Sequence, residues 1–126
     1  MKISKKPKQQ DGTNFNKMID SLGIPIIWED KKYHNGSYFT PDAYYLLERF
    51  VEGFNKRYTI RDIEVHIDFT KNSAQKIKFF EVKIHIQLAN GKLLIGHALT
   101  RNILAGIRIA ISKIKHESEK IIVKQH

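Results

Sequence analysis

Apolar and polar residues alternate strictly along two long stretches in the second half of the chain. In residues 61–70 the apolar side chains fall at every second position. The same alternation runs from Phe80 to Leu88 in the stretch 76–88, where the adjacent Phe79 and Phe80 break the phase with Ile77 and predict a bulge. An Asn-Gly pair at 90–91, the strongest short hairpin signal, joins the second stretch to a third over residues 92–99. This pattern predicts three consecutive antiparallel strands, each with one apolar and one polar face.

Two other segments carry the 3.6-residue apolar period of amphipathic helices. The first begins at Thr40, Pro41 and Asp42, because threonine is a good cap, proline fits the first helical turn and aspartate is favoured there. We expect this helix to end near Arg57. The second helix is predicted from about residue 101 to about residue 123. Its apolar face consists of Ile103, Leu104, Ile107, Ala110, Ile111 and Ile114.

A further strand is predicted before the first helix, over residues 24–30, where Ile24, Ile26 and Trp28 alternate with other residues. Pro25 cannot donate a ladder hydrogen bond, so we place this strand at an edge of the sheet. Two strands joined through a helix run parallel, with a right-handed crossover. The expected fold is therefore α+β, in the order β-α-β-β-β-α. It has a four-stranded sheet, with the first two strands parallel and the rest antiparallel, and two helices packed on one face.

The beginning of the chain has no comparable pattern. Residues 1–12 are polar and basic, and residues 13–22 predict only a short helix closed by Gly23. We therefore divide the chain into a flexible basic N-terminal arm over residues 1–22 and a single folded domain over residues 23–126. A chain of 126 residues suffices for one hydrophobic core.

Composition and charge narrow the class of protein. The chain contains no cysteine, which excludes disulfides, thiol catalysis and cysteine-ligated zinc. The formal net charge is +9, and residues 71–126 hold eleven basic but only three acidic residues. Such a concentration of positive charge favours a nucleic-acid partner. The sequence shows neither an apolar run of membrane-spanning length nor a secretory signal, so we expect a soluble, cytoplasmic protein.

Three stretches of sequence carry a family resemblance. They are TPDAYYLLERFVEGFNKRY at 40–58, IEVHI at 63–67, and EVKIHIQLANGKLLIGHAL at 81–99, which runs into NILAGIRIAISKI at 102–114. In order, spacing and charge they resemble the ribosome hibernation-promoting factor family, also called ribosome-associated inhibitors or ribosomal subunit interface proteins. The resemblance covers residues 24–120 and is to the short form of the family.

The resemblance implies a protein that is not an enzyme and needs no cofactor. Family members bind the small ribosomal subunit at the decoding region through 16S-type rRNA, block the mRNA and tRNA sites, and inhibit translation under stress. The resemblance also implies a monomer when free, with no membrane and no small-molecule substrate as partner. Lys56 and Lys113 match basic positions of the family's two helices. Arg108 and Ser112 stand where the family often has acidic residues, which makes this second helix more basic than usual.

The residues themselves indicate how RNA would be bound. Arg101, Arg108 and Lys115 recur every seven residues, so they form a stripe along the second helix. A rigid basic surface binds RNA phosphates with no need to read bases. The predicted RNA-binding set is Lys56, Arg57, Lys83, Lys92, Arg101, Arg108, Lys113 and Lys115.

The sequence leaves alternatives to a ribosome-binding protein open. His66, His85 and His97 lie on three successive predicted strands, and together they could bind a metal ion or serve as acid and base in a small ribonuclease. Spacing this loose is more typical of ordinary histidines on a polar sheet face, so we expect neither a metal site nor catalytic residues. The other alternative is a generic double-stranded RNA-binding module, whose usual order begins with a helix rather than a strand.

Overall fold

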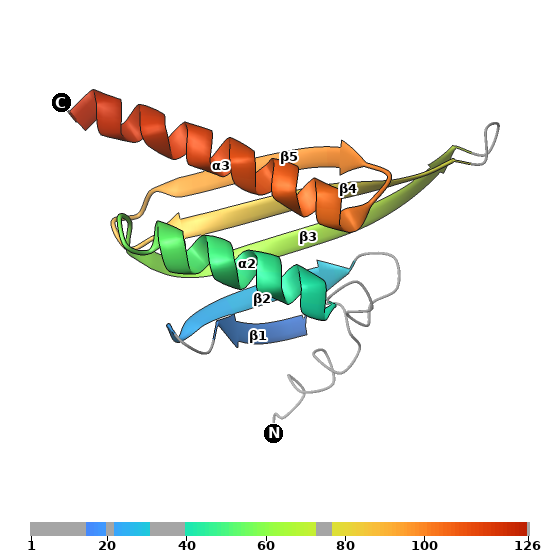
Figure 1. Ribbon diagram of the computed structural model, residues 1–126, viewed down its shortest axis with the longest axis horizontal. Coiled ribbons are helices and arrows are strands. Elements are labelled where there is room, and N and C mark those ends of the chain that lie inside the picture. The colour runs from blue at the N-terminus through green and yellow to red at the C-terminus, as the bar shows by residue number, and fades with distance from the viewer. Residues whose placement is uncertain (1–14, 20–21, 31–39, 73–76, 126) are drawn as a thin grey trace, which may run out of the picture.

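A computed structural model describes residues 15–19, 22–30, 40–72 and 77–125 of the protein (Figure 1). The sheet has five strands in the order β1-β2-β3-β4-β5. These are β1 (Phe15–Ile19), β2 (Ile24–Asp30), β3 (Ile60–Asn72), β4 (Ile77–Leu88) and β5 (Leu93–Thr100). Two helices, α2 (Pro41–Phe54) and α3 (Ile103–Gln125), lie side by side on the same face of the sheet. No described helix covers the other face, which is called the open face below.

The predicted fold class is confirmed at the level of an α+β domain with a mixed sheet and two helices. β2 pairs with β3 in parallel, and β3, β4 and β5 pair antiparallel, as the sequence pattern predicts. The sheet nevertheless has five strands rather than four. Within the described residues, no helix is long and apolar enough to cross a membrane.

The short helix predicted over residues 13–22 is wrong, because residues 15–19 form β1 and pair antiparallel with β2. Gly23 closes the turn between the two strands with a positive φ of 66°, and its N–H donates to the Ile19 carbonyl at 2.7 Å. Residues 15–19, assigned to the arm from the sequence, thus belong to the sheet. The rest of the predicted arm, residues 1–14 and 20–21, lies outside the described residues.

β2 is therefore an interior strand, which corrects its predicted place at the edge. Pro25 faces Met18 of β1, and pairing with β3 begins only at Ile26. Because Pro25 is the second residue of β2 and precedes the β3 ladder, its missing N–H leaves no gap between these two strands.

The apolar positions of the alternating strands form the core beneath the helices. Every second residue is buried from Ile63 to Ile67 on β3 and from Val82 to Leu88 on β4, and Trp28 of β2 is fully buried beside them. The bulge predicted at Phe79 and Phe80 is wrong, because β4 pairs with β3 there without a register shift. α2 and α3 complete the core from above with their own apolar faces. The largest side chains without solvent exposure include Trp28, Leu47, Ile63, Ile67, Ile84, Ile86, Ile107 and Ile114.

The two helices run parallel, with both first turns at one end of the molecule. Thr40 and Arg101, which precede the helices, line a common hollow, and the hydroxyl of Tyr58 donates to the Ser118 carbonyl at 3.1 Å near the other end. Two glycines, Gly96 of β5 and Gly106 of α3, let α3 lie close to the sheet. A Cβ atom at Gly96 of β5 would lie 2.1 Å from the backbone oxygen of Ala110.

The start of α2 depends on a side-chain cap. The hydroxyl of Thr40 accepts a hydrogen bond from the Ala43 N–H at 3.1 Å, which confirms the predicted helix start. The helix ends at Phe54, three residues before the predicted end. Asn55 is its C-cap residue, and the side chain of Asn55 accepts a hydrogen bond from the Ile60 N–H at 3.0 Å.

We expect Thr40→Ala to lower the free energy of unfolding by about 1 kcal/mol, because the Ala43 N–H loses its acceptor. Urea denaturation followed by Trp28 fluorescence measures this loss. Thr40→Ser is the matched control, since serine keeps the oxygen and should stay within a few tenths of a kcal/mol of the wild type. Equal stability of the alanine and serine variants would show that the cap contributes nothing.

Candidate nucleic-acid interface

The predicted stripe of α3 lies on the side of that helix which faces α2. Arg101, Arg108 and Lys115 are all exposed, and none of them forms an ion pair with another described residue. Seven residues of α-helix span about 10 Å, which separates Arg108 from Lys115 along α3, while Arg101 lies just before the first turn of that helix. We call these three residues the basic seam.

A row of aromatic rings lines the junction between the helices. Phe50, Phe54 and Tyr58 are in contact, with ring centroids 5.0 Å and 4.7 Å apart along the row. The ammonium of Lys115 lies 5.9 Å from the Phe50 ring centroid, and the guanidinium of Arg57 lies 6.0 Å from that of Tyr58. Contacts of this kind keep a cation against a ring face while its N–H groups stay available to another partner.

Three more predicted residues lie together beyond the C-terminal end of α2. Lys56 and Arg57 are exposed in the turn that follows the helix, and Arg57 lines a hollow of about 280 Å³ with Lys92 of the β4–β5 turn. We call Lys56, Arg57 and Lys92 the basic end. The structure thus brings together Arg57 and Lys92, which are far apart in the sequence, in a hollow that is also lined by Tyr58 of the aromatic row.

The remaining two predicted residues lie elsewhere. Lys83 is exposed on the open face, where it shares a hollow with Glu29, Asp68 and Glu81. Lys113 extends over the edge of the sheet, and its ammonium donates to the His97 carbonyl of β5 at 2.6 Å. The eight predicted residues therefore do not share one surface.

The two faces of the domain also differ in charge. Residues 101–120, which include most of α3, hold five basic and two acidic residues. The central strands present mainly carboxylates on the open face, with Lys83 among them. The acidic residues that alternate there with buried core positions are Glu29, Asp62, Glu64, Asp68 and Glu81. α2 itself carries Asp42, Glu48 and Glu52 against Arg49, so a polyanion is attracted to the α3 side of the helical face and repelled by the open face.

The three histidines of the sheet are divided into a pair and a single residue. His66 and His85 are neighbours, with ring centroids 5.2 Å apart. His97 instead contacts Glu81 at 2.7 Å, and Lys83 stands between it and His66 in the strand register. The predicted group of three histidines is thus not brought together.

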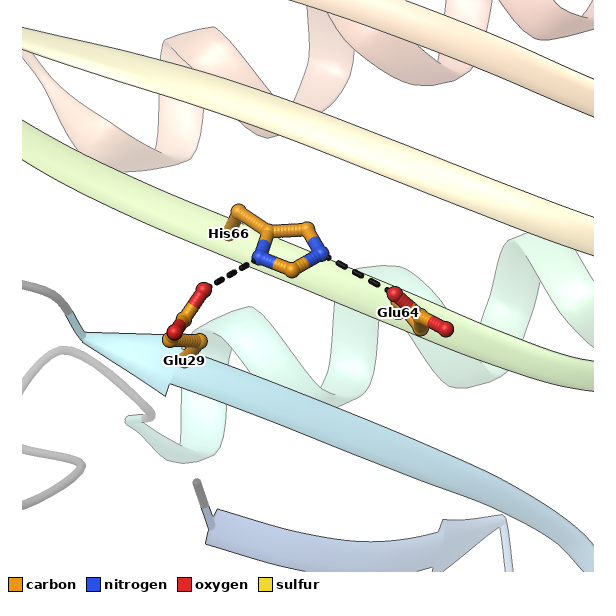
Figure 2. A network of polar contacts seen from close by, with 3 residues as sticks. All are labelled: Glu29, Glu64 and His66. Atoms are coloured by element: carbon orange, nitrogen blue, oxygen red, sulfur yellow. Dashed lines mark hydrogen bonds and ion pairs between the residues drawn. The ribbon is translucent and has the colours of Figure 1, made fainter. Parts of the chain in front are cut away.

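His66 is held between two carboxylates, as Figure 2 shows. Its Nδ1 lies 2.6 Å from a Glu29 oxygen, and its Nε2 lies 3.1 Å from a Glu64 oxygen. Burial lowers the pKa of the neighbouring His85 below its ordinary value. Since these groups come from β2, β3 and β4, three paired strands fix their positions.

Sequence reasoning missed two contributors to these surfaces. Glu29 contacts His66 only because β2 and β3 pair in the observed register. Arg49 of α2 is exposed on the helical side, where it donates to the Tyr45 hydroxyl at 2.7 Å and lies 5.5 Å from that ring. The spacing of Tyr45 and Arg49, four residues apart in a helix, is the signal that could have identified the second contact.

Comparisons with known proteins add nothing to this geometry. No protein-family model and no curated protein matches the chain.

Proposed function

We propose that this protein binds 16S-type rRNA in the decoding region of the small ribosomal subunit and inhibits translation by occupying the mRNA and tRNA sites. The proposal is supported by the family resemblance of residues 24–120 and by one structural observation above all. That observation is the basic seam, a row of exposed cations without carboxylate partners among the described residues, beside a second helix.

The physical basis of binding is the neutralisation of phosphates. Each cation of the basic seam that contacts a phosphate releases condensed counterions, and this release supplies affinity that needs no base reading. Arginines can also bind a phosphate with two parallel hydrogen bonds. Inhibition then follows from occupancy alone, because a rigid domain in the decoding region excludes the other ligands without any catalytic group.

The charge difference between the faces sets the orientation in this proposal. The helical face meets the RNA, and the acidic open face is directed away from it. Lys83 then makes no RNA contact, and the ammonium of Lys113 is already engaged by the His97 carbonyl. The proposed contact set consists of Lys56, Arg57, Lys92, Arg101, Arg108 and Lys115.

The double variant Arg108→Gln, Lys115→Gln tests this interface. We expect its affinity for purified small subunits to fall about 10–100-fold at moderate salt, because two charge-assisted contacts are lost. The slope of log affinity against log salt concentration should decrease in magnitude by about 1.5, since each phosphate contact contributes about 0.7–0.9. Cosedimentation at several salt concentrations measures both quantities.

Lys83→Gln is the matched control, because it removes one cation from the opposite face of the same sheet. Its binding and its salt slope are expected to equal those of the wild type. A double variant that binds as the wild type does would refute the proposed interface. Intact RNA in the same samples is expected, whereas cleavage would favour the ribonuclease alternative. Stronger binding to free duplex RNA than to subunits would favour the double-stranded RNA-binding module.

A further inference from the structure

The cluster around His66 on the open face has a feature that the proposed RNA interface does not use. If His66 is neutral, its hydrogen bond to Glu29 places the single ring proton on Nδ1. The lone pair of Nε2 then faces a Glu64 oxygen 3.1 Å away, and two acceptors at that distance repel each other. A cation beside Nε2 and the Glu64 oxygen would accept an electron pair from each of them.

His85 supplies a second acceptor at the same place. Its Nε2 is shielded from solvent and has no hydrogen-bond partner in the described part of the chain. A buried polar atom without a partner is uncommon in folded proteins and calls for an explanation such as a bound ion. An imidazole nitrogen with no other partner is a common ligand of metal ions.

The three side chains have the spacing of metal ligands. One ligand atom each from Glu64, His66 and His85 can be chosen so that all lie within 4.8 Å of one another. Ligands at 2.0–2.2 Å from a tetrahedral zinc ion are about 3.3 Å apart, so small side-chain rotations close the set. Glu64 and His66 are two residues apart on one face of β3, and His85 is directly opposite Glu64 on β4.

The surroundings suit a cation. Glu29 on Nδ1 of His66 is the kind of outer carboxylate that orients a ligating histidine and fixes which nitrogen carries the proton. Together with Glu64, the carboxylates of Glu29, Asp68 and Glu81 face a single ammonium, that of Lys83. A divalent ion would help to balance this excess of negative charge. The adjoining hollow of about 180 Å³ is lined by Glu29, His66, Asp68, Glu81, Lys83 and His85.

We propose that Glu64, His66 and His85 bind a divalent transition-metal ion of the zinc class on the open face, with a further coordination position directed at the hollow. Two imidazoles and one carboxylate are the ligand chemistry of such ions. This proposal is independent of the proposed ribosomal function, because the cluster lies on the face of the sheet opposite the basic seam.

Titration calorimetry with Zn²⁺ tests the site on the full chain, stripped with a chelator and free of any affinity tag. We expect one strong site at neutral pH and a higher melting temperature when Zn²⁺ is in excess. His85→Ala is expected to remove the site. Glu29→Gln, which alters only the outer contact, should weaken binding about 10–100-fold.

His97→Ala is the matched control, because it removes a histidine from the same face without touching the cluster. It should bind Zn²⁺ as the wild type does.

If His85→Ala fails to fold, Glu64→Gln provides the decisive ligand variant. Absence of Zn²⁺ binding by the wild-type chain would overturn the proposal. Equal binding by wild type and Glu64→Gln would overturn it as well. Binding of the ligand variants to small subunits, which should be unchanged, distinguishes this result from a failure of the proposed function.

Discussion

Gly96→Ala should lower the free energy of unfolding by at least about 3 kcal/mol, at the upper end of what overpacking costs in a folded core. The new Cβ would lie 2.1 Å from the Ala110 oxygen and 2.8 Å from its carbonyl carbon, both of which are backbone atoms of α3. No rotamer change can relieve that contact, so the whole helix would have to move away from β5. A domain of this size is stable by only about 5–15 kcal/mol, and the melting temperature should fall by about 10 °C or more.

Gly53→Ala is the matched control for this experiment. Gly53 lies in α2, and a Cβ placed there meets no atom within 4 Å. Alanine at this position should raise stability by about 0.5–1 kcal/mol, because glycine is the poorer helix former. Thermal unfolding followed by circular dichroism compares the two variants directly. If the Gly96→Ala protein has the same melting temperature as the wild type, α3 does not approach β5 as closely as described.

Trp28→Ala is expected to cost about 3–5 kcal/mol, the usual range for truncating a large aromatic side chain in a core. Trp28 has no solvent exposure and lies on β2, with Val65 of β3 as its neighbour in the parallel ladder. Its removal leaves a cavity beneath the helices that the surrounding isoleucines and valines cannot fill without moving. Because this is the only tryptophan, urea denaturation of the variant must be followed by circular dichroism.

Tyr45→Ala serves as the comparison, since it also removes an aromatic ring but from a side chain that is 54% exposed on α2. The free energy of unfolding of this variant should fall by less than about 1 kcal/mol, because a surface substitution leaves no cavity. A comparable loss in both variants would contradict the buried position of Trp28.

The elements with strong local signals were predictable from the sequence. Strict alternation identified β3 and β4 to within two residues, and the cap at Thr40 fixed the start of α2, because both signals depend on residues close together in the chain. β1 was missed because it has only five residues, whose apolar positions at Phe15, Met18 and Ile19 also fit a helical period. Its strand conformation comes from pairing with β2, a tertiary effect that overrides weak local preference.

The candidate sites were predictable only where they depend on a single element. That Arg108 and Lys115 share one side of α3 follows from helical periodicity alone, whereas Arg101 lies just before that helix. The contact between Glu29 and His66 depends on how β2 pairs with β3 across the intervening helix, and no local pattern encodes that register. The contact of Lys113 with β5 likewise depends on how α3 is rotated over the sheet.

The parallel course of α2 and α3 gives the helical face an electrostatic direction. Peptide dipoles add along each helix, so both partial positive ends lie near Arg101 and α2 directs its partial negative end toward Lys56 and Arg57. The backbone therefore reinforces the side-chain charge where the helices begin and offsets part of it where α2 ends. The two dipoles thus give the helical face a polarity along its length, in which three side-chain cations offset the negative end of α2 and the positive helix ends lie beside Arg101.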